Sequence, residues 1–194
     1  MGFTAFAAFS TSSIVTAPCG PLPAIFSTSR PRSFARALAK TPELNGFWRD
    51  GAFAPSKAIH IGVAISIREG GLIAPAIHDA DRKDLGELMR ELSDVVTRAR
   101  AGSLRSSEMS DPTITVTNLG ESGVEAVHGV IYPPQVALVG FGRLVSRPWV
   151  DGGGVRAMPL VTATLAADHR VSDGIRGARF LAELRERLQH PEEL

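Results

Sequence analysis

The hydrophobic period of the chain changes abruptly within residues 160–188, and this change limits what the chain can fold into. Over residues 160–167 apolar side chains alternate with threonine and alanine, and a period of two predicts a half-buried strand. The two faces carry Val161, Ala163, Leu165 and Ala167 on one side and Thr162, Thr164 and Ala166 on the other. Later residues have helical spacing, with one face carrying Ala178, Leu181, Leu184 and Leu188. The segment predicts a strand that leads directly into an amphipathic helix.

The junction between this strand and helix carries the sharpest catalytic signal in the sequence. Its sequence is DHRVSDG, residues 168–174, in which a histidine stands between an aspartate and an arginine. A histidine held at a strand-to-helix junction is well placed to act as a general base. His169 is therefore the first candidate catalytic residue. A lone His-x-x-x-Asp pattern is weak evidence, so the rest of the chain has to agree with it.

Two further strands and a helix are predicted upstream. Residues 60–67 alternate regularly and predict a strand, and residues 72–77 predict a shorter one whose Pro75 favours an edge or a bulge. The clearest helical stripe begins at Leu85 and runs to Ala99, with Gly102 placed to end the helix. Asp79 and Asp81 could be a catalytic pair of acids, but caps of this helix are the favoured interpretation.

Residues 113–118 predict a strand with three threonines on one face, and residues 136–145 predict a long strand. Between Val150 and Val155 three consecutive glycines predict a hairpin turn. The glycines do not form the GxxxxGK[ST] pattern of a phosphate-binding loop. Trp48 and Trp149 are predicted to be packing residues, because they are too far apart in sequence to suggest a stacking platform.

DHRVSDG followed by GARFL resembles the active-site signature of the 2-oxoacid dehydrogenase acyltransferases, the dihydrolipoamide acyltransferase (E2) components. The resemblance continues through residues 42–45 (PELN), 113–120 (TITVTNLG) and 133–135 (PPQ), and is collinear over residues 34–194. It implies an α/β fold with the chloramphenicol acetyltransferase-like mixed sheet flanked by helices. The resemblance also implies that the first part of that domain, roughly its opening third, is missing from this chain.

The resemblance assigns roles to three residues. His169 corresponds to the general base, Asp173 belongs to the same signature, and Thr117 falls where a hydroxyl stabilises the oxyanion. Either Asp173, or Asp168 together with Arg170, is expected to hold the loop and the imidazole in place rather than to transfer protons. The family usually has serine at the position of Thr117, and an ordinary strand threonine remains the alternative. The implied substrates are coenzyme A and a lipoyl group carried on another domain or chain, with no metal.

The implied assembly is a homotrimer or a larger set of trimers, with the site shared between neighbouring subunits and with E1 and E3 as partner components. An alternative is a catalytically silent, truncated E2-like fragment that acts as an assembly or interaction subunit. Unchanged activity without His169 would contradict its assignment as the base.

Composition excludes several other classes. The chain has 194 residues and 44% hydrophobic residues, enough for one sizeable core. A net charge of +1 favours neither nucleic acid nor an acidic-tail function. Its single cysteine, Cys19, excludes an internal disulfide framework, the five histidines have no zinc-ligand spacing, and no apolar run reaches the ~18–20 residues of a membrane span.

Residues 1–33 differ in composition from the rest, because they are rich in Ser, Thr, Ala and Pro and no acidic residue precedes Glu43. We expect an irregular leader over 1–33 and the partial acyltransferase domain over 34–194. A transit peptide, a disordered extension and a mis-assigned start all remain open for the leader. The expected location is the bacterial cytoplasm, or the mitochondrial matrix if the leader is a transit peptide.

Overall fold

A seven-stranded mixed sheet organises the computed structural model, which describes residues 8–16, 30–67 and 70–189. Its strands run in the order β1 (Ala8–Thr16), β11 (Gly154–Asp168), β9 (Ala137–Phe141), β8 (Ile114–Asn118), β4 (Ile61–Val63) and β7 (Ala76–Ile77). The seventh strand, β10 (Val145–Asp151), pairs with the first half of β11. β4, β8 and β9 are mutually parallel, and the other pairings are antiparallel. The mixed α/β fold expected from the sequence is confirmed.

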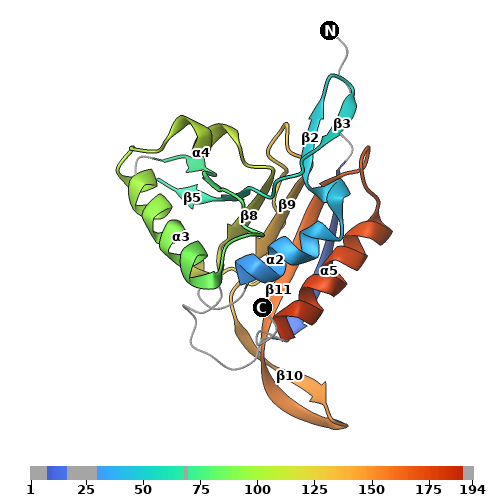
Figure 1. Ribbon diagram of the computed structural model, residues 1–194. Helices are drawn as coiled ribbons and strands as arrows, with labels where there is room; N and C mark the ends of the chain where they lie inside the picture. Colours follow the sequence, from blue (N-terminus) through green and yellow to red (C-terminus); the bar gives the residue numbers. More distant parts are fainter. Residues whose placement is uncertain (1–7, 17–29, 68–69, 190–194) are drawn as a thin grey trace.

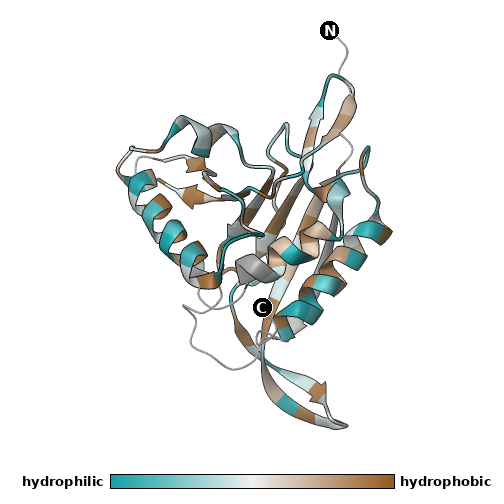
Figure 2. Cartoon of the chain, viewed as in Figure 1, coloured by the Kyte–Doolittle hydropathy of each residue, from teal (hydrophilic) through white to brown (hydrophobic). Residues whose placement is uncertain are grey.

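The helices cover one face of this sheet (Figure 1). They are α2 (Arg30–Ala39), α3 (Leu85–Arg100) and α5 (Gly174–Gln189), of which α3 and α5 confirm the helices predicted at residues 85–99 and after residue 174. Phe34 of α2 meets Phe180 of α5 edge to face, with ring centroids 5.8 Å apart, and both side chains are buried. The outward faces of α3 and α5 are largely hydrophilic while the strands behind them are largely hydrophobic (Figure 2). The core therefore lies between helices and sheet.

Apart from the half-buried Thr162, β11 is buried on both faces over residues 160–168, so the predicted half-buried strand is wrong in this respect. Val161, Ala163 and Leu165 face the helices in the core, as expected. The opposite face is covered by the segment after β8, because the hydroxyl of Thr164 donates a hydrogen bond to the Val127 carbonyl oxygen. Gly140 on β9 allows this approach, since a Cβ there would lie 2.7 Å from the same oxygen.

The β10–β11 hairpin extends away from the body of the molecule (Figure 1). Its turn places Gly152 at φ 57° and Gly153 at φ 82°, conformations that favour glycine and suit a two-residue turn. The hairpin predicted from the three glycines is therefore confirmed. The described side chains at residues 146–150 and 152–157 are exposed. The tip of this hairpin therefore buries little apolar surface within one chain.

The strand predicted over residues 60–67 divides at Ala64. β4 belongs to the main sheet, whereas β5 (Ile65–Ser66) pairs with β6 (Leu72–Ile73) in a separate two-stranded sheet. The second predicted strand, 72–77, divides in the same way at Pro75, which has no N–H to donate, and its carbonyl oxygen accepts from Val63. A break at Pro75 agrees with the edge or bulge that the sequence favoured.

The cap of α3 is Asp84, not Asp79 or Asp81 as the sequence suggested. Asp84 and Glu87 form a capping box, in which each side chain accepts from the other's backbone N–H at 2.8 and 3.0 Å. Asp79 lies further upstream at φ 46°, and its N–H donates to Nδ1 of His60. The expected stop at Gly102 is confirmed by its φ of 68° just past the helix.

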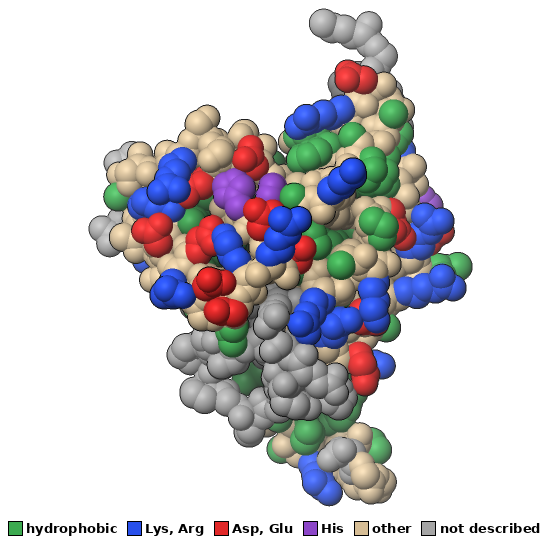
Figure 3. All heavy atoms as spheres, viewed as in Figure 1, with side chains coloured by type: hydrophobic (Ala, Val, Ile, Leu, Met, Phe, Trp, Pro, Cys, Tyr) green, Lys and Arg blue, Asp and Glu red, His purple; other side chains and the backbone are tan. Residues whose placement is uncertain are grey.

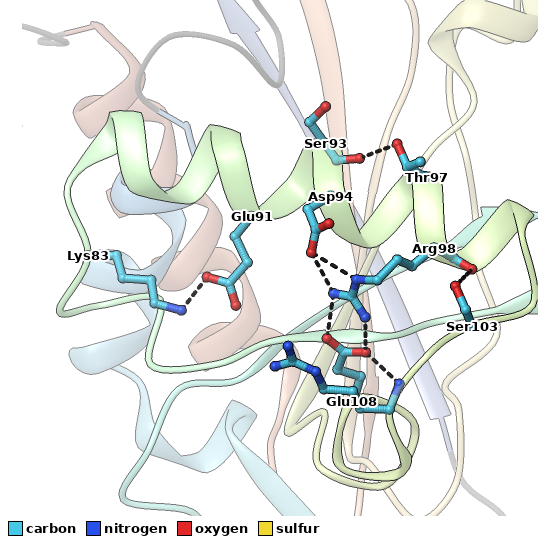
Figure 4. Close-up of polar contacts among 9 residues, drawn as sticks. Lys83, Glu91, Ser93, Asp94, Thr97, Arg98, Ser103 and Glu108 are labelled. Carbon is cyan, nitrogen blue, oxygen red and sulfur yellow. Dashed lines mark hydrogen bonds and ion pairs between the residues drawn. The ribbon is translucent and has the colours of Figure 1, made fainter.

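Arg98 of α3 is bound to Glu108 of the short helix α4 (Ser106–Ser110), which the sequence did not predict (Figure 4). The two N–H···O distances are 2.5 and 2.7 Å, and the Arg105 backbone N–H donates to the same carboxylate. Glu108 is 5% exposed. The hydrogen bonds from Arg98 outweigh the cost of burial and lower the pKa of Glu108 to about 2.

This ion pair predicts a specific dependence of stability on pH. A lowered carboxyl pKa stabilises the fold above the unfolded pKa and ceases to do so as pH falls from about 4.5 towards about 2. Glu108→Gln should cost about 3 kcal/mol of unfolding free energy at pH 7, and the difference from wild type should shrink at pH 3. Denaturant unfolding at both pH values measures this. The control is Glu91→Gln, because the Glu91 side chain is 27% exposed against 6% for that of Glu108, and loss of its ion pair with Lys83 should cost under ~1 kcal/mol. A constant difference across pH would contradict the prediction.

β1 lies within the stretch expected to be irregular. Residues 8–16 pair antiparallel with β11 from Ala8 opposite Asp168 to Thr16 opposite Leu160. This segment contains the β-forming residues Ile14 and Val15 and none of the prolines of the leader, so the open edge of β11 can pair with it. Cys19 and the rest of residues 1–7 and 17–29 lie outside the described residues, and the interpretations of the leader as a targeting segment stay predictions.

Along the described ranges, no helix combines the length and the apolar character that crossing a membrane requires. Basic and acidic side chains are intermixed over the face seen in Figure 3, in line with the small net charge.

Candidate active site

Asp168 fixes the loop that carries His169. Its side chain is 1% exposed, and its backbone N–H donates to the Val136 carbonyl oxygen at 2.8 Å. Its own carbonyl oxygen accepts from Val171 and Ser172, both at 3.0 Å. The end of β11 is thereby joined to a tight turn, and the turn is held by backbone hydrogen bonds on both sides of His169.

The carboxylate of Asp168 binds the side chain of Arg170 around this turn. Nε and Nη2 of Arg170 donate to Oδ1 and Oδ2 at 2.9 and 2.6 Å, and the Arg170 backbone N–H donates to Oδ1 at 3.0 Å. Burial opposes ionisation of Asp168, but these hydrogen bonds outweigh it and hold the pKa of its carboxyl below its usual range. The same pairing raises the pKa of Arg170. The two residues that flank His169 are thus one ion pair.

His169 itself is exposed, and Asp173 begins the next helix. The Asp173 carboxylate accepts from the backbone N–H of Arg176 at 2.8 Å, and its carbonyl oxygen accepts from Gly177. This is helix capping, which agrees with the loop-holding role expected for Asp173. The strand, the clamped turn and the capped helix together present His169 at the surface.

Thr117 lies on β8, in a row of threonines on the sheet face opposite the helices. Thr113 donates to the amide oxygen of Asn45 at 2.6 Å, and Thr115 donates to that of Gln135 at 2.7 Å, both in buried surroundings. These bonds explain why the PELN and PPQ segments stand near this strand, roles that sequence patterns alone did not reveal. Thr117 is half-buried beside Gly140.

One chain does not bring Thr117 and His169 together. Thr117 pairs with Gly140 on β9, and Gly140 pairs with Thr164 on β11. His169 follows five residues beyond Thr164, which is about 16 Å along the strand at ~3.3 Å per residue. The two candidate residues therefore lie towards opposite ends of the same sheet.

A groove of about 460 Å³ lies between the end of α2 and the start of α5, lined by Lys40, Thr41, Glu43, Arg176, Arg179 and Glu183. Neither Thr117 nor His169 lines this groove. Among the described residues, no group of three or more His, Cys, Asp and Glu side chains is arranged to hold a metal ion.

Solved structures share the fold of this chain. A truncated catalytic core of the 2-oxoacid dehydrogenase complex from Thermoplasma acidophilum is 26% identical with a TM-score of 0.83, covering 96% of this chain and 89% of that one. The cubic core of a pyruvate dehydrogenase multienzyme complex and the Azotobacter vinelandii dihydrolipoamide acetyltransferase each have a TM-score of 0.88 at 23% identity, over 98% of this chain and 85% of theirs.

Chloramphenicol acetyltransferase has the same fold more distantly, with a TM-score of 0.60 at 13% identity over 93% of this chain and 88% of that one. The fold, with a histidine loop after its longest strand, is that of the chloramphenicol acetyltransferase-like class. The chain covers 85–89% of the E2 catalytic-core structures named above, and β1 takes an edge position in its sheet.

Curated relatives are similar over most of this chain. The acetyltransferase component of the pyruvate dehydrogenase complex from Rickettsia felis is 34% identical over 157 residues, which are 81% of this chain and 38% of that protein. The lipoamide acyltransferase component of the branched-chain alpha-keto acid dehydrogenase complex from Pseudomonas aeruginosa is 35% identical over 162 residues, 82% of this chain and 38% of that protein. The chain spans under two fifths of the length of these relatives.

The family profile for the 2-oxoacid dehydrogenases acyltransferase (catalytic domain) matches residues 28–194. The chain belongs to this family, the E2 acyltransferases of 2-oxoacid dehydrogenase complexes, as its motifs indicated.

Proposed function

We propose that this protein transfers an acyl group between coenzyme A and a dihydrolipoyl thiol, as the E2 component of a 2-oxoacid dehydrogenase complex. The observation that carries the proposal is the exposed His169 on a loop clamped by Asp168 and Arg170, in a chain of this family. Coenzyme A and the lipoyl group are substrates, and the proposed chemistry requires no metal.

His169 acts as the general base in this proposal. An unprotonated imidazole is a base that can accept a thiol proton, so His169 can generate the attacking thiolate. The thiolate then attacks the thioester carbonyl carbon, and negative charge develops on its oxygen. As the original carbon–sulfur bond of the thioester breaks, leaving the acyl group on the attacking sulfur, the proton on His169 passes to the departing thiolate, which regenerates the base.

Thr117 supplies the hydroxyl that stabilises the oxyanion, and it comes from a neighbouring subunit. The register of β8, β9 and β11 favours this arrangement, because it separates Thr117 from His169 within one chain. We propose a homotrimer, or a larger assembly of trimers, in which each site joins His169 of one subunit to Thr117 of the next. The related cubic core of a pyruvate dehydrogenase complex is an assembly of this family.

The spacing of the three candidate residues supports their roles. In the Azotobacter vinelandii enzyme a serine, a histidine and an asparagine have been investigated for their role in catalysis. They are separated in sequence by the same numbers of residues as Thr117, His169 and Asp173 are here. Threonine keeps the hydroxyl of serine, and aspartate keeps the acceptor oxygen with which Asp173 caps α5.

Exposed apolar side chains on the projecting hairpin support assembly. Val150 and Val155 are 70% and 72% exposed, and Trp149 is 37% exposed. A cluster of this kind on an extended arm is typical of a surface that a partner covers. We propose that a second copy of the chain covers it, and that E1 and E3 components associate with the complete complex.

The test is an exchange assay with the purified protein, dihydrolipoamide and a panel of acetyl-, succinyl- and isobutyryl-CoA. We expect CoA release with at least one donor, and the preferred donor identifies the acyl group, since the relatives act in both pyruvate and branched-chain complexes. Light scattering should give a mass of three chains or a multiple of three. Trimers that release no CoA from any donor would favour the alternative, a catalytically silent assembly subunit.

A further inference from the structure

Trp48 lies over the cation that flanks the candidate base. It belongs to β2 (Gly46–Arg49), which forms a hairpin with β3 (Ala52–Pro55) beside the end of β11. The guanidinium carbon of Arg170 lies 4.2 Å from the centroid of the Trp48 ring. At this distance a guanidinium stacks on the indole and is attracted by its π system. The sequence predicted only a packing role for Trp48.

The hairpin that carries Trp48 is itself attached to the strand beside the catalytic loop. The Trp48 backbone N–H donates to the Pro134 carbonyl oxygen at 2.8 Å, and Phe47 forms a bridge with Gln135. The next residue, Val136, accepts the hydrogen bond from the Asp168 N–H. Trp48 and Asp168, which both contact the Arg170 side chain, are therefore anchored to the same stretch of chain.

We infer that Trp48 is a positioning residue for His169, acting through Arg170 and Asp168. This inference rests on the proposed function of His169 as the base. The Arg170 side chain is held at one end by the Asp168 carboxylate and on its flat face by the indole. Since Asp168 and Arg170 flank His169, the position of their side chains limits where the imidazole can lie.

The physical reason is that the Arg170 side chain is only 22% exposed although it carries a full charge. Removing the indole admits water to the guanidinium and gives it other rotamers, and the ion pair around His169 then loses its single geometry. A displacement of ~1 Å at a catalytic group can lower a rate by about 10²-fold. The loss should therefore fall on kcat, because Trp48 is not proposed to contact either substrate.

The test compares Trp48→Ala with Trp48→Phe and with Phe47→Ala in the full chain. We expect Trp48→Ala to lower kcat by about 10–100-fold with KM for acyl-CoA changed by less than about threefold. Trp48→Phe keeps an aromatic face and should retain activity within about threefold. Phe47 stacks on Arg49 at 4.4 Å on the same strand, so Phe47→Ala removes an equivalent aromatic pair that does not touch the loop.

Arg170→Lys supplies a second line of evidence, because lysine keeps the charge and loses the planar fork. If Trp48 acts through Arg170, kcat of the Trp48→Ala/Arg170→Lys double variant should be no lower than kcat of the less active single variant. Additive losses would overturn the inference, and so would a change confined to KM or an equal loss in Phe47→Ala.

A readout without catalysis separates this inference from the proposed function. In histidine-labelled protein, the His169 ring resonances, identified by their absence in His169→Gln, should shift or broaden in Trp48→Ala and stay in place in Phe47→Ala. An unmoved His169 signal overturns the positioning role even if the enzyme is active. If the wild-type protein is inactive but the His169 signal shifts in Trp48→Ala, the proposed function is contradicted and the positioning contact is supported.

Discussion

Replacing His169 with alanine is expected to abolish most acyl exchange while leaving the fold intact. General-base catalysis contributes typically 10²–10⁴-fold, and without the base the thiol must ionise unaided. Because His169 is exposed at the end of the clamped loop, its removal should shift the unfolding midpoint little. We expect kcat to fall by about 10²–10⁴-fold with KM nearly unchanged.

The measurement is the initial rate of CoA release with saturating dihydrolipoamide, together with thermal unfolding of the same preparation. His78→Gln is a suitable control, because His78 lies beyond β7, at the other edge of the sheet, and hydrogen-bonds Asp111. If His169→Ala kept wild-type activity, the assignment of the base would be wrong, whether or not its unfolding midpoint changed.

Replacing Thr117 with valine is expected to lower kcat by about 10²–10³-fold. Valine has nearly the same shape as threonine and lacks the hydroxyl that donates to the oxyanion. Thr117→Ser keeps the donor and should retain most activity. Equal activity of the valine and serine variants would show that Thr117 is an ordinary strand residue, the alternative that the sequence left open.

The same pair of variants tests whether the site is shared between subunits. His169→Ala chains retain Thr117, and Thr117→Val chains retain His169. In a mixed trimer, a site is complete where a Thr117→Val subunit supplies His169 and the next subunit, a His169→Ala chain, supplies Thr117. Co-expression in equal amounts should restore about one quarter of wild-type activity by random assembly of trimers. A mixture no more active than either variant alone would mean that one chain supplies both groups.

Much of the fold follows from periodicity because it reflects local physics. The stripe from Leu85 to Ala99 forms α3, and three consecutive glycines form the turn of the β10–β11 hairpin. These segments keep their conformation because spacing and backbone preferences agree with their surroundings. The break at Pro75 was also foreseeable, since proline cannot donate to a ladder.

Other features depend on partners distant in sequence. A regular alternation across residue 64 gave no sign that Ile61 and Ile65 belong to different sheets. Residues 8–16 form a strand because the edge of β11 is available to pair with them. Asp84 rather than Asp79 caps α3, because Asp79 lies five residues further upstream, where its N–H donates to His60, just before β4.

The sequence by itself determined the family: DHRVSDG at a strand-to-helix junction, in a chain collinear with the E2 acyltransferases, was sufficient to identify it and to single out His169, Asp173 and Thr117 as candidate site residues. Only the tertiary structure decided how these residues relate. Hydrogen-bond register places Thr117 and His169 at opposite ends of one sheet, and it brings Trp48 onto Arg170. The physical reason is that residue identity and local spacing determine what a side chain can do, whereas pairing between distant strands determines what it can reach.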